Sequence, residues 1–97
     1  MMEERDYLII LYDFYSELIS DKQKEYFEDY YFNNLSLGEI SENTGYSRNA
    51  IHKNIKSVCD KLYFYEDKLG LYRKREKLYN VINDLDDDIK KRIEKIY

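Results

Sequence analysis

The sequence predicts an all-α protein, a small helical bundle, and two observations carry this prediction. The chain of 97 residues has no proline and only three glycines, while 43% of its residues are hydrophobic and 37% are charged. Continuous helices suit such a composition, whereas turn-rich β proteins need more proline and glycine. Apolar residues also recur three or four positions apart along most of the chain, which is the period of an amphipathic helix.

The length of the chain suits one hydrophobic core, so we expect a single domain over residues 1–97. The one cysteine, Cys59, cannot form an internal disulfide, and no signal-peptide pattern occurs. The longest uncharged apolar run, residues 7–12, is far shorter than the roughly 20 residues that cross a bilayer. We therefore expect a cytoplasmic protein without a membrane partner.

The first two helices are predicted over residues 3–19 and from Asp21 to about residue 34. Ser20 and Gln23 have the spacing of a capping box, which marks the start of the second helix. The apolar residues expected to face the core are Leu8, Leu11, Tyr15, Leu18 and Ile19 in the first helix and Tyr26, Phe27, Tyr30 and Tyr31 in the second.

Ser36 and Glu39 repeat the capping-box spacing, so a short third helix should cover residues 37–43. Gly45 then ends that helix, because glycine readily adopts the left-handed conformation. Ser47 caps a fourth helix, which should continue to Gly70. Its apolar positions step by three or four residues: Ile51, Ile55, Val58, Leu62, Tyr65 and Leu69.

The C-terminal extension, residues 71–97, should form amphipathic helices. A fifth helix is predicted over residues 72–83, and the acidic residues 84–88 suit the first turn of a sixth. One bent helix is the alternative. The apolar stripe Leu78, Ile82, Leu85, Ile89, Ile93 and Ile96 should fold back over the first and fourth helices or pair with a second copy, and we favour the homodimer.

Residues 36–58 have the pattern of a helix-turn-helix with a long recognition helix. In this motif, apolar residues lock two helices together and leave the start of the second free to enter the DNA major groove. Leu37 and Ile40 should face the core, Gly45 should make the turn, and Tyr46 and Ile51 should lock the second helix. Small Ser41 permits close approach of the helices.

The exposed residues predicted at the start of this recognition helix are of types that contact guanine, adenine and phosphate. We expect them to bind nucleic acid, and DNA more than RNA, although a charged helix face can also serve only for solubility. They are Arg48, Asn49, His52, Lys53 and Lys56.

Charge is distributed unevenly along a chain whose net charge is -4. Residues 1–46 hold 3 Lys or Arg against 11 Asp or Glu, whereas residues 47–77 hold 9 against 4. An acidic protein can therefore present a basic face to a polyanion. Further contacts with a nucleic-acid backbone are expected from Ser47, Lys68, Arg73, Lys74 and Arg75, although these basic residues could equally form a solubilising surface.

No pattern predicts an enzyme, a cofactor or a bound metal. His52 and Cys59 lie seven residues apart on one predicted helix, roughly 10 Å from each other, which is too far for a catalytic pair or a shared metal. The acidic residues 84–88 lack the glycine and glutamate spacing of an EF-hand. The chain also has no glycine-rich phosphate loop.

Several linked motifs resemble the YlxM family of small bacterial proteins. The segments DFY, KQ followed by YY, SLGEI, SRNAI and YEDKL occur in this order between residues 7 and 71. The corresponding family segments are DFY, KQ followed by YY, SLGEIAEE, SRQAVYDNIK and YEEKL. Family members usually have tyrosine and aspartate at the positions of His52 and Lys53. The matching residues are Ser47, Arg48, Asn49, Ala50, Ile51 and Asn54.

The resemblance implies a fold similar to region four of bacterial sigma factors, a DNA-binding regulatory role, and participation in the signal recognition particle pathway. The alternative is a protein-interaction adaptor, or an RNA-binding accessory of that particle, in which the helix-turn-helix is only a scaffold. The adaptor's working surface would be the acidic, tyrosine-rich first two helices. Charge reversals at Glu25, Glu28 and Asp29 should then affect only the adaptor function.

Overall fold

The structure is a computed structural model that describes residues 2–96, and all regular structure within this range is helical. The all-α prediction is therefore confirmed. The predicted domain, 1–97, extends one residue beyond this range at each end, and the predicted extension, 71–97, extends one residue beyond it at Tyr97. The elements are α1 (Glu4–Tyr15), the 3-10 helix η1 (Ser16–Leu18), α2 (Asp21–Tyr31), α3 (Leu37–Thr44), α4 (Arg48–Leu69), α5 (Leu71–Ile82) and α6 (Asp87–Ile96).

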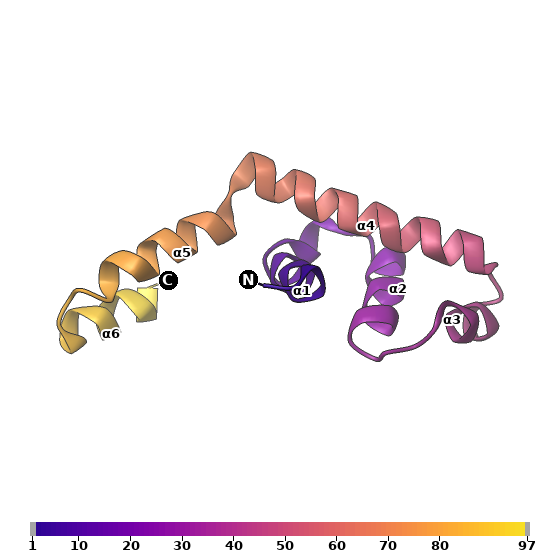
Figure 1. The fold of residues 1–97 in the computed structure, drawn as a ribbon, viewed down its shortest axis with the longest axis horizontal. Helices are drawn as coiled ribbons and strands as arrows, with labels where there is room; N and C mark the ends of the chain where they lie inside the picture. The colour runs from indigo at the N-terminus through magenta and orange to yellow at the C-terminus, as the bar shows by residue number, and fades with distance from the viewer. Residues whose placement is uncertain (1, 97) are drawn as a thin grey trace.

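The long helix α4 is the spine of an elongated molecule of 54 × 26 × 25 Å (Figure 1). Helices α1, α2 and α3 each pack against α4. Two neighbouring clusters of buried side chains form the core. One cluster joins α1 and α2 to the middle of α4 and includes Leu8, Leu11, Tyr15, Phe27, Val58 and Leu62. The other joins α2 and α3 to the first half of α4 and includes Tyr26, Ile40, Ile51 and Ile55.

Serine caps start three helices as predicted. The Oγ atoms of Ser20, Ser36 and Ser47 each accept a hydrogen bond from the backbone N–H three residues later. Only Ser36 forms the complete capping box, with Glu39. The prediction of a capping box at Ser20 was wrong in its second half, because the side chain of Gln23 is used in hydrogen bonds to α4 instead.

The first helix is shorter than predicted. Helix α1 ends at Tyr15, and the tighter turn of η1 follows. A 3-10 turn has three residues rather than 3.6, so it rotates side chains away from the α-helical stripe. Leu18 is consequently 52% exposed, while Ile19 remains buried. Tyr30 and Leu69, also predicted to face the core, are exposed. Tyr30 lies beside the buried face of α2, and Leu69 is the last residue of α4.

A buried carboxylate fixes the elbow between α4 and α5. Glu66, only 3% exposed, accepts hydrogen bonds from the Tyr15 hydroxyl at 2.6 Å and from the backbone N–H groups of Tyr72 and Arg73 at 3.1 Å. The Tyr15 hydroxyl in turn accepts the N–H of Leu71 at 3.0 Å. These bonds satisfy the first N–H groups of α5, which a helix cannot satisfy internally. The direction of α5 is thereby set by the core.

Helices α5 and α6 form a hairpin at the end of the molecule away from α2 and α3 (Figure 1). Residues 83–86 separate them, so the alternative of one bent helix was wrong. The alternative in which the apolar stripe folds back over α1 and α4 does not hold for α6, which packs against α5. The break lets α6 reverse direction, and Ile82 at the end of α5 is buried, whereas Ile89 and Ile96 of α6 stay exposed.

Candidate nucleic-acid interface

A short turn, held by side-chain hydrogen bonds to the backbone, joins α3 to α4. Gly45 ends α3 with a φ of 79°, the left-handed conformation predicted for it. The Ser41 Oγ donates to the carbonyl of Tyr46 at 2.5 Å. Thr44 Oγ1 donates to the carbonyl of Ile40 and accepts the N–H of Tyr46. These bonds fix the angle at which α4 leaves α3.

Apolar contacts hold the two helices together from the inner side. Ile40 and Ile51 are fully buried, and Leu37 is half-buried against the same cluster. Tyr46, also predicted to lock α4, is 48% exposed, but its ring meets the ring of buried Tyr26 edge-on, at 6.4 Å between ring centres. The Nζ of Lys22, also in α2, stands 3.9 Å from the centre of the Tyr46 ring.

Asn54 occupies a position where helix-turn-helix motifs prefer an apolar residue, and a polar network accommodates it. Its Nδ2 donates to the carbonyl of Ala50 at 2.9 Å, and its Oδ1 accepts from Gln23 Nε2 at 3.2 Å. Gln23 Oε1 accepts from Lys61 at 2.8 Å. Both polar ends of the amide are therefore satisfied, and α2 is tied to α4 by residues far apart in the sequence.

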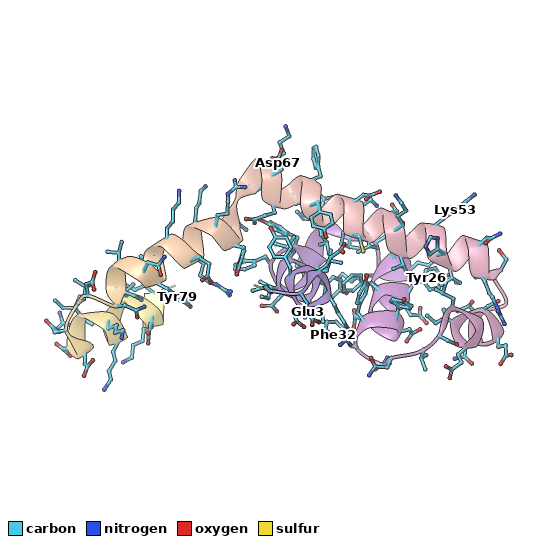
Figure 2. The ribbon with its side chains drawn as sticks, viewed as in Figure 1. Glu3, Tyr26, Phe32, Lys53, Asp67 and Tyr79 are labelled. Carbon is cyan, nitrogen blue, oxygen red and sulfur yellow. The ribbon has the colours of Figure 1, made fainter. Side chains whose placement is uncertain are left out.

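The outer face at the start of α4 brings the five predicted contact residues together. All five are exposed, and the first turn of α4 contains no acidic residue. Figure 2 shows Lys53 on the outward side of the helix. Asp60 lies one turn beyond the basic segment and pairs with Lys56 at 3.9 Å. The basic face consists of Arg48, Asn49, His52, Lys53 and Lys56.

Gly38 in α3 supports this face, although sequence analysis did not identify it. A Cβ atom at Gly38 would lie 2.9 Å from Nη2 of Arg48. The guanidinium of Arg48 therefore rests on the first turn of α3, in the space that glycine leaves. Only a structure could show this contact, because nothing in the sequence pairs residue 38 with residue 48.

Four basic residues predicted to contact the nucleic-acid backbone lie far from this face: Lys68, Arg73, Lys74 and Arg75. Lys68 is twenty residues from Arg48 along α4, which corresponds to roughly 30 Å at the helical rise. Arg73 and Lys74 are exposed at the start of α5. Arg75 is engaged within the protein, since its guanidinium carbon lies 4.7 Å from the ring centre of Phe14. Ser47, by contrast, is exposed next to the basic face.

Cys59 is half-buried, with its Sγ 3.7 Å from the hydroxyl of Tyr31. Burial raises the pKa of the Cys59 thiol, which keeps it protonated and unreactive at neutral pH. Within residues 2–96, no group of three or more His, Cys, Asp or Glu side chains is placed to hold a metal ion. Over the same range, none of the helices combines the length and apolar character that crossing a membrane requires.

Comparison with known proteins agrees with this geometry. Residues 2–97 match the model of the family UPF0122, described as "Putative helix-turn-helix protein, YlxM / p13 like"; this description names no catalytic activity. The UPF0122 protein lin1916 of Listeria innocua is 42% identical over 99% of this chain and 96% of its own. The UPF0122 protein FN1394 of Fusobacterium nucleatum is 47% identical over 89% of this chain and 84% of its own.

A third relative comes from a different bacterium. The UPF0122 protein TTE1463 of Caldanaerobacter subterraneus is 46% identical over 81% of this chain and 68% of its own. Each of these identities extends over most of both chains. Together with the family match and the observed helix-turn-helix, they establish that the chain belongs to the UPF0122 family of YlxM-like helix-turn-helix proteins.

Proposed function

We propose that this protein binds DNA through the start of α4 and acts as a regulatory protein. The observation that carries the proposal is the basic face, whose five side chains are exposed while Ile51 and Ile55 of the same turns are buried. Helix α4 is thus anchored to the core on its buried side and accessible to a ligand on its exposed side. This is how a recognition helix is presented to a major groove.

The residues of the basic face have distinct proposed roles. Arg48, Asn49, His52 and Lys53 contact base edges or nearby phosphates, because their side chains suit guanine, adenine and phosphate oxygens. Ser47, the N-cap of α4, contacts the DNA backbone as helix-start residues commonly do, and Lys56 contacts it through its charge.

A second, weaker footprint is proposed at the α4–α5 elbow, where Lys68, Arg73 and Lys74 contact the backbone. Its distance of roughly 30 Å from Arg48 is slightly less than one turn of DNA, about 34 Å. Arg75 is excluded from the proposed contacts, because its guanidinium lies over the rings of Phe14 and Tyr72.

Fluorescence anisotropy with random-sequence duplex DNA across a salt series tests the proposal. Affinity should fall steeply with salt, and Arg48→Ala with Lys53→Ala should weaken binding and reduce the salt slope by about 1 to 2. The control is Lys90→Ala with Lys91→Ala, which removes the same charge from α6. Salt-independent affinity, or equal weakening by both variants, would contradict DNA binding through α4.

The same titration with the RNA of the signal recognition particle tests the proposed preference for DNA and the proposed role in that particle's pathway. The resemblance over residues 7–71 supports a role in that pathway, and a cytoplasmic location accompanies both nucleic-acid partners. We expect duplex DNA to bind more tightly, because a straight recognition helix suits the major groove of DNA better than the narrow one of RNA. Tighter RNA binding that depends on Arg48 would instead favour the accessory role.

The exposed apolar residues of the α5–α6 hairpin support a homodimer. Val81 is 62% exposed and Ile96 is 88% exposed. Helix α6 has acidic residues in its first turn and a basic residue in its last, so two antiparallel copies would match charge as well as apolar surface. Sedimentation equilibrium should give a dimer that Val81→Glu with Ile96→Glu converts to a folded monomer. A wild-type monomer would contradict the dimer.

A second candidate function, the protein-interaction adaptor, is favoured by the acidic surface of α1 and α2. Charge reversals in this surface test the adaptor, but two of the three predicted positions already form hydrogen bonds. Glu28 accepts a hydrogen bond from the hydroxyl of Tyr12, and Asp29 accepts one from the side chain of Asn33. Reversing the charge of Glu28 would break a part-buried hydrogen bond, and reversing that of Asp29 would remove an exposed one. Glu25 is exposed and is the cleaner position for a charge reversal. Loss of a partner protein with unchanged DNA affinity would support the adaptor.

A further inference from the structure

Phe64 exposes an aromatic ring on α4, beyond the end of the basic face. The residue is 57% exposed. It lies eleven residues after Lys53, which is close to three helical turns, so the two side chains leave α4 on the same side, roughly 16 Å apart along the helix. Figure 2 shows that Lys53 points outward. A ligand that lies along this side of α4 therefore meets both residues.

An open hollow of about 530 Å³ connects Phe64 to the basic face. Asp60 brings the one negative charge of this hollow and pairs with Lys56 at 3.9 Å, and Lys61 donates a hydrogen bond to Gln23 at 2.8 Å. Three lysines thus stand against one aspartate around the ring. The residues that line the hollow come from α4 and include Lys53, Lys56, Asp60, Lys61, Phe64 and Tyr65.

The neighbours of the Phe64 ring leave more than half of the residue open to solvent. The ring of Tyr65 meets it at a steep angle of 69°, with 6.0 Å between the ring centres. The Nζ of Lys68 lies 5.7 Å from the centre of the Phe64 ring and 3.9 Å from the carboxylate of Asp67. Phe64 is therefore a supported aromatic surface with lysines before and after it along α4.

The distance from the start of α4 indicates which form of nucleic acid suits this ring. Phe64 lies roughly 24 Å beyond Arg48 on a straight helix, about twice the width of the DNA major groove. The base edges that the start of α4 would contact are therefore out of its reach. A paired duplex would present charged phosphates to the ring, whereas an unpaired base presents an aromatic face that can stack on it.

We propose that Phe64 stacks on an unpaired base of a strand that extends from the duplex held by the basic face. Lys53 and Lys68, on either side of the ring, would contact the phosphates of that strand. An acidic peptide would also match the lysines, but continuity with the proposed DNA contacts favours nucleic acid. The inference rests on the proposed DNA binding and names the form of the ligand, a duplex with an unpaired extension.

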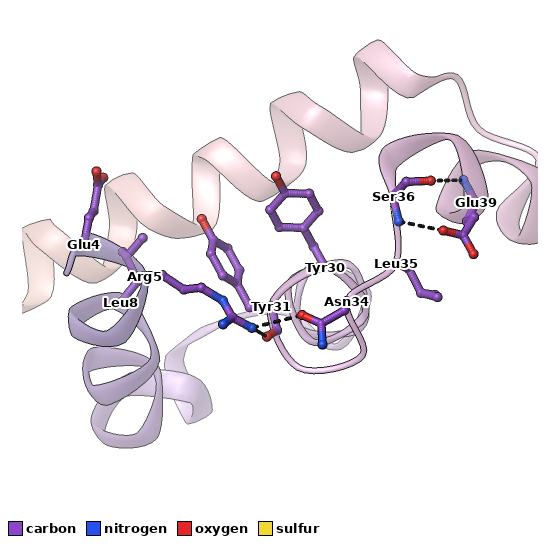
Figure 3. Close-up of a pocket in the computed structure, with 9 residues that line it drawn as sticks. All are labelled: Glu4, Arg5, Leu8, Tyr30, Tyr31, Asn34, Leu35, Ser36 and Glu39. Atoms are coloured by element: carbon purple, nitrogen blue, oxygen red, sulfur yellow. Dashed lines mark hydrogen bonds between the residues drawn. The ribbon is translucent and has the colours of Figure 1, made fainter.

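A second exposed ring, in acidic surroundings, provides a matched control. Tyr30 is 40% exposed in a hollow of about 580 Å³ between α1, α2 and α3, which is also lined by Glu4 and Glu39 (Figure 3). The guanidinium of Arg5 in this hollow already donates to the carbonyl of Tyr31 at 2.6 Å. Carboxylates repel a polyanion, so removal of the Tyr30 ring should not affect the binding of a strand.

The test is fluorescence anisotropy of the full chain with three labelled probes. The first is a blunt DNA duplex, the second is the same duplex with a short thymidine overhang, and the third has an abasic overhang of the same length and charge. The wild type should bind the thymidine overhang about fivefold more tightly than the abasic one, because only thymidine can stack. A ribonucleotide overhang of uridines shows whether RNA is held as well as DNA.

Phe64→Ala should abolish the advantage of thymidine over the abasic overhang and leave the affinity for the blunt duplex unchanged. Phe64→Trp should keep the advantage, and so should the control Tyr30→Ala. Because Phe64 is exposed, circular dichroism should show that its variants stay folded.

Equal binding of the thymidine and abasic overhangs by the wild type would overturn the inference. If duplex binding still depended on Arg48, the proposed DNA binding would remain intact. Weaker binding of the blunt duplex by Phe64→Ala would also overturn it, since the ring would then contact paired DNA. So would a change in oligomeric state of Phe64→Ala in sedimentation equilibrium, which would assign the ring to contacts between protein copies. Failure to bind any of the probes would instead contradict the proposed function itself.

Discussion

Gly38 occupies the second position of α3, where alanine is intrinsically about 1 kcal/mol better in a helix. The Gly38→Ala variant should therefore be as stable as the wild type or more so, because only the mobile end of the Arg48 side chain has to move. The displaced guanidinium should lower DNA affinity by about threefold or more, a part of the 1–3 kcal/mol that a good arginine–base contact supplies. Thermal unfolding and DNA titration measure the two effects separately.

A double-mutant cycle with Arg48→Ala provides the control for this prediction. If Gly38 acts through Arg48, adding Gly38→Ala to Arg48→Ala should cause no further loss of affinity. Additive losses would show that Gly38 affects DNA binding by another route.

Individual residues also mark where sequence analysis succeeds and where it stops. The caps at Ser36 and Ser47 were predictable because each involves residues three positions apart. The burial of Glu66 was not, because its partners Tyr15 and Tyr72 meet it only at the elbow. The same holds for Gln23 and Asn54, which are 31 residues apart in the chain.

At the scale of elements, the turn between α3 and α4 depends on the left-handed backbone of Gly45. Space is not the constraint there, since a Cβ atom would meet nothing within 4 Å. Gly45→Ala should therefore destabilise the protein by about 1 kcal/mol through backbone strain alone. Gly45→Asn should cost less, because asparagine tolerates this conformation. Urea unfolding measures both, and equal stability of all three proteins would show that the turn adopts another geometry.

The helices differed in how well the sequence predicted them. Helix α4 was predicted to within a residue, because it has a serine cap, a long apolar stripe and a terminal glycine. The break into α1 and η1 was missed, since the apolar spacing continues across it. The pairing of α5 with α6 was missed for a different reason. An apolar stripe predicts that one face of a helix will be buried, but it does not predict which element will pack against that face.

At the scale of the whole molecule, tyrosines link stability to alkaline pH. Burial and the hydrogen bond to Glu66 raise the pKa of Tyr15 to about 12, from about 10 in an unfolded chain. A raised pKa means that the folded state favours the neutral hydroxyl. Its contribution is complete below about pH 10 and is lost as the pH rises toward 12. Burial also raises the pKa values of Tyr12 and Tyr31, which act in the same direction.

We expect the melting temperature to fall as the pH rises through this window, monitored by circular dichroism. Tyr15→Phe should be less stable at neutral pH, by about 1–3 kcal/mol, because Glu66 and the N–H of Leu71 lose a buried partner. The variant should then lose less stability than the wild type between neutral and alkaline pH. An identical alkaline loss in both proteins would assign the effect to the other tyrosines.

The overall charge of the molecule predicted less than its distribution did. A sequence pI near 5.0 argues against a polyanion partner, yet the acid and base lie on different elements. The basic face could be predicted because its residues are neighbours on one helix. The hollow lined by Glu4, Tyr30 and Glu39 could not, because α1, α2 and α3 each supply part of it.

The position of the spine in the chain has a consequence for how the protein is made. Helices α1, α2 and α3 precede α4 in the sequence, yet each packs against it. During synthesis, the first half of the chain therefore emerges from the ribosome before the surface that covers it exists. The core can close only after Leu62 has left the exit tunnel, so the apolar side of α1 stays uncovered while residues 16–62 are translated.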